Sequence, residues 1–96
     1  MIKTFRVDID GFGKACLLNG RKGKVQSVHL WTDSTQPLQV SVIADGYREL
    51  VSDYLLQGSE SVKLPVQAQV KTRNLRAVVK SVQEVKAGVI ISVEYA

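Results

Sequence analysis

Positively charged side chains are concentrated in two short segments that also have the composition of turns. Residues 19–24 read Asn-Gly-Arg-Lys-Gly-Lys, and an Asn-Gly pair is a strong hairpin signal. Residues 71–76 read Lys-Thr-Arg-Asn-Leu-Arg. The cations of the two segments are Arg21, Lys22, Lys24, Lys71, Arg73 and Arg76. Lys and Arg attract phosphates, and counterion release makes that affinity independent of base sequence. Hairpin tips are polar in many proteins, but two basic tips together predict a nucleic-acid-binding surface.

Two aromatic residues could add base stacking to these phosphate contacts. Trp31 alternates away from Val28 and Leu30, so it belongs to the opposite face of its predicted strand. Phe12 stands between two glycines, where it could be exposed at a bend. Unpaired bases stack on aromatic rings, and both rings could equally fill the core. The predicted nucleic-acid-binding set is completed by Lys14 and Lys80.

The remaining chemically capable residues give no pattern typical of an enzyme. His29 is the single histidine, and a lone histidine on a strand is usually a packed or surface residue. Asp8 and Asp10 share a strand face, but no further ligand accompanies them to build a metal site. Cys16 lies in an apolar run and is interpreted as a small buried hydrophobe. We therefore expect a binding protein without catalytic residues, cofactor or metal.

The charge is divided unevenly along the chain. The net charge is +4. Residues 1–32 carry six cations and two acids, residues 33–60 one cation and five acids, and residues 61–96 six cations and two acids. Two basic parts therefore flank one acidic part. This division is consistent with a cationic binding face opposite an acidic one.

The elements that must position these residues are mostly strands. Val and Ile make up 20 of the 96 residues, and β-branched residues favour pleated, half-buried surfaces. We expect one domain over residues 1–96 that begins with a long strand at 2–18, bent at its glycines. Strands at 24–32 and 38–44 follow, and the three are expected to form a meander.

The pattern then changes to helical spacing. Tyr47, Leu50, Val51, Tyr54 and Leu55 recur at intervals of three and four, and Gly58 would end the element. We predict one helix of about three turns here. Alternating strands are predicted at 62–70 and 75–85, followed by a turn at 86–88 and a last strand at 89–95. Pro65 places its strand at a sheet edge.

The last strand carries a prediction about assembly. Residues 89–93 read Val-Ile-Ile-Ser-Val and are apolar on both faces. Such a strand needs cover on both faces. We expect a homodimer in which the last strands meet across a two-fold axis, or else a strand that folds back over its own barrel.

This element order is that of a five-stranded OB-like Greek-key barrel with one helix between strands 3 and 4 and an extra C-terminal strand. Over about residues 2–85 the chain resembles small OB-fold single-stranded-DNA-binding proteins of phage or plasmid type, by element order rather than by a signature motif. The resemblance implies a ligand that lies between the two basic loops. Residues 19–25 also resemble the basic turn of KOW modules, SH3-like barrels that bind RNA.

The sequence thus predicts sequence-independent binding of single-stranded nucleic acid, with DNA favoured over RNA. The alternatives are an RNA-binding KOW/SH3-like barrel and a protein-interaction or oligomerisation module. The chain has no apolar run long enough to cross a membrane, and charges interrupt its start where a signal peptide is apolar. With a single cysteine, we expect a cytoplasmic protein.

Overall fold

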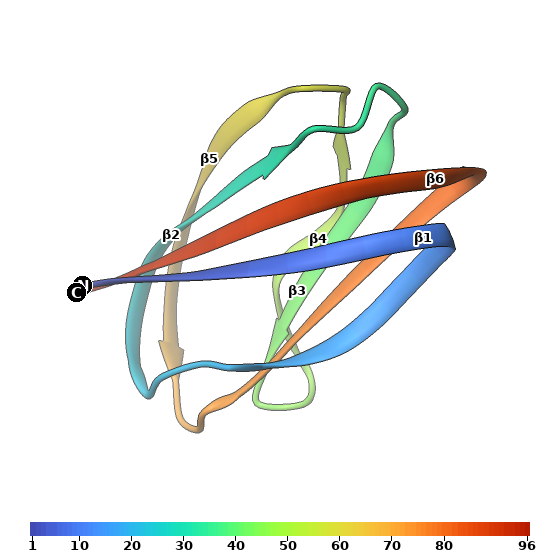
Figure 1. The fold of residues 1–96 in the computed structure, drawn as a ribbon. Helices are drawn as coiled ribbons and strands as arrows, with labels where there is room; N and C mark the ends of the chain where they lie inside the picture. The colour runs from blue at the N-terminus through green and yellow to red at the C-terminus, as the bar shows by residue number, and fades with distance from the viewer.

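The computed structural model describes residues 1–96 as a mostly β protein of six antiparallel strands (Figure 1). The strands are β1 (Ile2–Asn19), β2 (Gly23–Thr32), β3 (Leu38–Ala44), β4 (Arg48–Leu56), β5 (Ser61–Val70) and β6 (Asn74–Tyr95). They form a nearly closed barrel, as the sequence predicted in outline. The structure contains no helix, and so none long and apolar enough to span a membrane.

The two longest strands run together and bend at the same corner. β1 pairs with β6 from Ile2↔Glu94 to Asn19↔Asn74, with one shift of register between Gly11 and Gly13. Gly11 has a φ of +127°, which a side chain would disfavour, and this allows the bend that the sequence predicted. Figure 1 shows both strands turning back at this corner, so each contributes one arm to each half of the barrel.

β6 is the central strand of the barrel. The strand order is β4-β3-β6-β2-β5, and β1 lies beside β6 off this path. The first half of β6 pairs with β3, and its second half pairs with β2. On either side of its bend, β6 turns odd-numbered side chains into the core between the two halves, and Val79, Val89 and Ile91 are fully buried there.

The helix predicted between Tyr47 and Gly58 is wrong, because β4 occupies most of this segment. Val51, Tyr54 and Leu56 lie opposite Val42, Val40 and Leu38 of β3. A bulge between Val51 and Tyr54 contains Asp53, whose φ is +45°. Because of the extra residue, an odd-numbered side chain (Val51) faces the core before the bulge, and even-numbered ones (Tyr54 and Leu56) face it after the bulge. The bulge therefore gives a strand the three-residue spacing that is typical of a helix.

Three other pairing predictions are also wrong. The segments 2–18, 24–32 and 38–44 do not form a meander, since none of β1, β2 and β3 pairs with another of the three. Residues 86–88 are not a turn but part of β6, where Gly88 lies opposite Asp8. The last strand at 89–95 is likewise part of β6 and is flanked by β1 and β2, so it has no free edge. The strand predicted at 62–70 and its edge position are confirmed by β5, which pairs only with β2.

Candidate nucleic-acid interface

Three connecting loops lie together at one end of the barrel, at the bottom of Figure 1. They are the β1–β2 loop (residues 20–22), the β3–β4 loop (45–47) and the β5–β6 loop (71–73). The first and third are the two basic segments singled out in the sequence. The Gly20 amide donates to the Arg73 carbonyl at 3.0 Å, which joins the two loops directly.

Four cations surround a recess of about 490 Å³ at this end. Arg21, Lys22 and Arg73 come from the two joined loops, and Lys3 comes from the start of β1. We call these four residues the basic recess. The Lys3 ammonium donates to the Gly20 carbonyl at 3.4 Å, which ties the start of β1 to its end.

The charge of the basic recess is not neutralised by acids. The structure contains two ion pairs, Arg6–Asp8 and Lys63–Glu94, and neither involves the recess. Arg21, Lys22 and Arg73 are exposed. Four cations without carboxylate partners make a positive potential that attracts anions.

Asp45, in the β3–β4 loop, binds the backbone of the β5–β6 loop and forms no ion pair with the basic recess. The Asp45 carboxylate accepts hydrogen bonds from the Lys71 amide (3.0 Å), the Thr72 amide (2.9 Å) and the Thr72 hydroxyl (2.8 Å). The Lys71 amide contact is the largest cause that holds the pKa of Asp45 below its ordinary value. Asp45 therefore fixes the β5–β6 loop that presents Arg73.

The β1–β2 loop is anchored by a hydrogen bond to a buried side chain of the barrel. The Arg21 amide donates to the hydroxyl of the buried Tyr95 at 3.0 Å. A Cβ at Gly20 would lie 3.1 Å from Leu75 and 3.3 Å from the Arg73 carbonyl oxygen. Only a glycine allows this close approach of the two loops without displacement of a neighbour. The basic recess is thus built on anchored backbone.

Tyr47 adds an aromatic ring to the same end of the barrel. Its side chain is 72% exposed in the β3–β4 loop, directly after Asp45 and Gly46. Tyr47 was predicted to lie in a helix with Leu50, Val51 and Tyr54, so its exposure in a loop was not expected. Lys3 was missed too, because the chain start reaches this end only where β1 folds back at Gly11 and Gly13. No local sequence signal identifies Lys3, whereas Asp-Gly-Tyr is a turn signal that could have exposed Tyr47.

The other predicted loop cations belong to the same two segments but do not line the basic recess. Lys71 lies in the loop held by Asp45, and Lys24 lies at the start of β2, opposite Gln69. Arg76 lies opposite Leu17 on β1, three residues beyond Arg73. All three are exposed.

Four of the predicted residues lie elsewhere. Trp31 is 38% exposed on the outer face of β2, eight residues beyond Gly23, which is roughly 26 Å along a strand. Phe12 is 62% exposed at the β1 corner. Lys80 lies opposite Gly13 near that corner. The structure therefore separates the stacking candidates from the basic loops.

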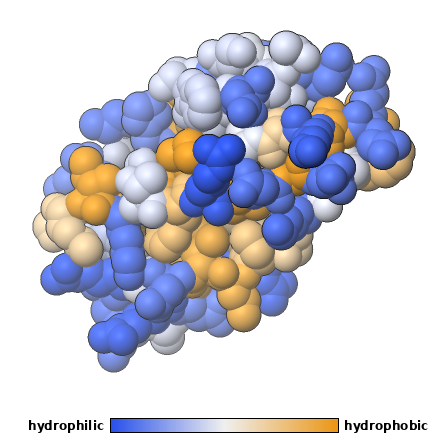
Figure 2. Space-filling view, viewed as in Figure 1, coloured by the Kyte–Doolittle hydropathy of each residue, from blue (hydrophilic) through white to orange (hydrophobic).

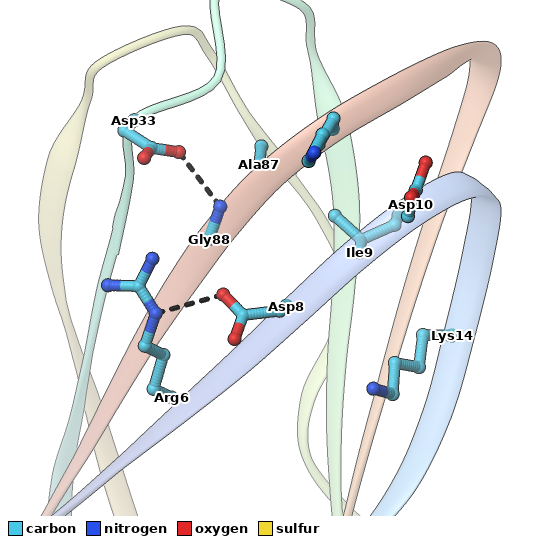
Figure 3. Close-up of a pocket in the computed structure, with 9 residues that line it drawn as sticks. Arg6, Asp8, Ile9, Asp10, Lys14, Asp33, Ala87 and Gly88 are labelled. Carbon is cyan, nitrogen blue, oxygen red and sulfur yellow. Dashed lines mark hydrogen bonds and ion pairs between the residues drawn. The ribbon is translucent and has the colours of Figure 1, made fainter.

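Lys14 lines a second recess, shown in Figure 3, in which both signs of charge are mixed. Arg6 donates to Asp8 at 2.9 Å, and Asp33 accepts from the Gly88 amide at 2.8 Å. Asp10 and Lys86 complete its charged lining. No group of three or more potential metal-ligating side chains occurs in the structure. The charged side chains that line this recess are of both signs, whereas those of the basic recess are all positive.

No family model and no curated protein sequence matches the chain. Among solved structures the chain is similar to PirA, with 14% identity, a TM-score of 0.58, and coverage of 97% of this chain and 93% of that chain. It also matches the Drosophila melanogaster CENP-C cupin domain (15% identity, TM-score 0.41, 96% and 58% covered). A third match is the EclA C-terminal domain, a sugar-binding protein (13% identity, TM-score 0.46, 96% and 78% covered). The similarity to PirA shows a shared fold, and the other two are too distant to support an argument.

Proposed function

We propose that this protein is a non-enzymatic binding protein for single-stranded DNA, with little sequence preference. The observation that carries the proposal is the basic recess, in which four cations from three chain segments converge without a carboxylate partner. Phosphates are the natural ligands of such a surface, because each contact releases condensed counterions.

The exposed Tyr47 ring favours a single strand over a duplex. Unpaired bases present their faces to aromatic side chains, and each stack contributes ~1–3 kcal/mol. In a duplex those faces are covered by neighbouring bases. A strand whose phosphates follow Arg73, Arg21 and Lys22 would bring a base to the β3–β4 loop beside them.

The ligand class can be tested by fluorescence anisotropy with labelled oligo-dT, oligo-rU and a duplex of equal length. We expect oligo-dT to bind more tightly than the duplex. About four phosphate contacts predict a log–log salt slope of about −3, which is about a 50-fold loss of affinity between about 50 and 200 mM salt.

Each alternative gives a different result. Tighter binding of oligo-rU than oligo-dT would support the RNA-binding KOW-like interpretation. Absence of binding to any oligonucleotide at low salt would leave a protein-interaction module and refute the proposal. A flat salt response would refute the electrostatic mechanism even if binding were seen.

A further inference from the structure

One arm of β1 is a regular sheet edge with no partner. β1 pairs with β6 on one side only, and its other side has no hydrogen-bonded strand. Between Ile2 and Gly11 the register against β6 is continuous, without a bulge. Natural edge strands usually carry a proline, a bulge or a cover that prevents further pairing.

The other two sheet edges have such protection. β5 contains Pro65, which lacks an amide donor, and its register against β2 shifts between Val25 and Ser27. β4 is interrupted by the bulge at Asp53, and the register of β4 against β3 shifts twice. Both arms of β1 therefore remain without proline or bulge, and the first arm, from Ile2 to Gly11, is the longer regular edge. Its charges are of both signs, so they do not all repel an added strand.

The open edge is accompanied by exposed apolar side chains. Of the eight large hydrophobic residues that are exposed, four lie within residues 1–19. They are Met1 (56% exposed), Ile2 (61%), Phe12 (62%) and Leu17 (72%). Figure 2, in the same view as Figure 1, shows hydrophobic side chains gathered in the middle of the face that the first arm of β1 crosses. Met1, Ile2 and Phe12 stand at the two ends of the first arm, whereas Leu17 lies on the second arm.

The sequence of this arm is complementary to itself when read in the opposite direction. A two-fold axis through Val7 would place Arg6 opposite Asp8, Phe5 opposite Ile9, and Ile2 opposite Phe12. Both copies of the Arg6–Asp8 pair would then face each other across the interface. Opposite charges and apolar pairs are the cross-strand neighbours that stabilise antiparallel sheets.

The same register matches the geometry of the arm. Val7 lies at the middle of the stretch from Ile2 to Phe12, so the axis lets the two arms overlap over their full length. The pairing joins odd with odd residues, so Phe5, Val7 and Ile9 keep facing the core side in both copies. A shift by one residue would turn them to the outer face.

We infer that the first arm of β1 is a homodimer interface, at which a second copy of this chain pairs antiparallel about Val7. The two four-stranded halves β5-β2-β6-β1 become one continuous sheet. Arg6 and Asp8, which pair within one strand in the single chain at 2.9 Å, exchange partners across the two-fold axis. This interface replaces the last strand, where the sequence placed the dimer contact, and it does not depend on nucleic-acid binding.

A charge swap tests the interface and its register together. In Arg6→Asp, each Asp8 faces a second acid, and in Asp8→Arg, each Arg6 faces a second cation. Light scattering should give a mass near twice 10.6 kDa for the native protein, and each single variant should raise the dimer Kd at least about 30-fold. The double variant Arg6→Asp/Asp8→Arg should restore the dimer. Lys80→Asp, on the other arm of the corner, is the matched control and should dimerise normally.

Disulfide trapping gives an independent readout of the register. Opposed Cα atoms in an antiparallel pair are about 4.5–5.5 Å apart, within the range that a disulfide spans. In a Cys16→Ser background, a mixture of Arg6→Cys and Asp8→Cys chains should crosslink into heterodimers, and neither alone should do so efficiently. A monomer up to about 1 mM, or a dimer that all the charge variants leave unchanged, would overturn the inference. Crosslinking of either chain only with itself would overturn the register.

Discussion

Replacement of Asp45 should loosen the β5–β6 loop and, with it, the basic recess. Its carboxylate accepts three hydrogen bonds from Lys71 and Thr72. Asp45 also has a φ of +58°, which Asn tolerates and Ala does not. Asp45→Asn keeps the backbone preference and one acceptor oxygen, so it isolates the charge-assisted part of these bonds.

The expected loss of folding stability follows from the number of hydrogen bonds and their exposure to solvent. Three exposed hydrogen bonds at the low end of the usual range contribute about 1.5 kcal/mol together. Asp45→Asn, which retains part of them, should cost about 1 kcal/mol, or about 4–8 °C in Tm for a domain of this size. Asp45→Ala adds the penalty of a positive φ and should cost about 2 kcal/mol.

The pH dependence gives the sharper test. The folded pKa of Asp45 lies below its ordinary 3.8, so the carboxylate stabilises the fold above that value. This contribution is lost as the pH falls below 3.8 through the folded pKa. The Tm difference between the native protein and Asp45→Asn should therefore be full at pH 7 and shrink toward zero in strong acid. Circular dichroism melts of the native protein and of Asp45→Asn at each pH measure this difference. An equal Tm at pH 7, or a difference that persists at low pH, would refute this role of Asp45.

Three further substitutions test other parts of the structure. Tyr47→Ala should weaken oligo-dT binding about 5- to 150-fold with an unchanged Tm, while Tyr47→Phe should bind normally. A Tm loss in the Ala variant would show that the ring packs instead. Trp31→Ala should lower stability by about 1–2 kcal/mol, because the ring is partly covered. It should leave oligo-dT affinity within about 2-fold, because the ring is far from the basic recess. A selective loss of binding would contradict this placement. Gly13→Ala should cost about 1–3 kcal/mol in a denaturant melt, because its Cβ would lie 2.9 Å from the Val79 carbonyl oxygen; an unchanged midpoint would contradict the tight corner.

Local patterns predicted the strands well but not their partners. The long bent β1 was predictable because Gly11 and Gly13 interrupt an alternating segment. Strand β4 was mistaken for a helix because the bulge at Asp53 shifts its inward positions by one residue. Such a bulge is specified by its contact with Ser41, whose hydroxyl accepts from the Asp53 amide at 2.9 Å, and contacts of this kind are invisible in a local pattern.

The site was predictable to a similar degree. Arg21, Lys22 and Arg73 were found because basic turns are recognisable in sequence. Their meeting was expected from an OB-like strand order, but it arises here from the pairing of β1 with β6, which brings Asn19 opposite Asn74. Lys3 reaches the recess because β1 folds back at its corner, and no local pattern reports where the chain start then lies.

The central claim, that the basic recess binds single-stranded DNA, is tested most directly by a matched pair of charge reversals. Arg21→Glu/Lys22→Glu changes the recess, and Lys14→Glu/Lys80→Glu makes the same change in net charge on the two lysines that the structure places elsewhere. Oligo-dT titrations are made at several salt concentrations, the same for each variant. The first variant should lose at least about 30-fold in affinity at low salt and reduce the salt slope by about 1.4, as expected for two lost phosphate contacts. The second should lose no more than about 3-fold. Equal losses in the two variants, or an unchanged affinity in the first, would contradict the claim.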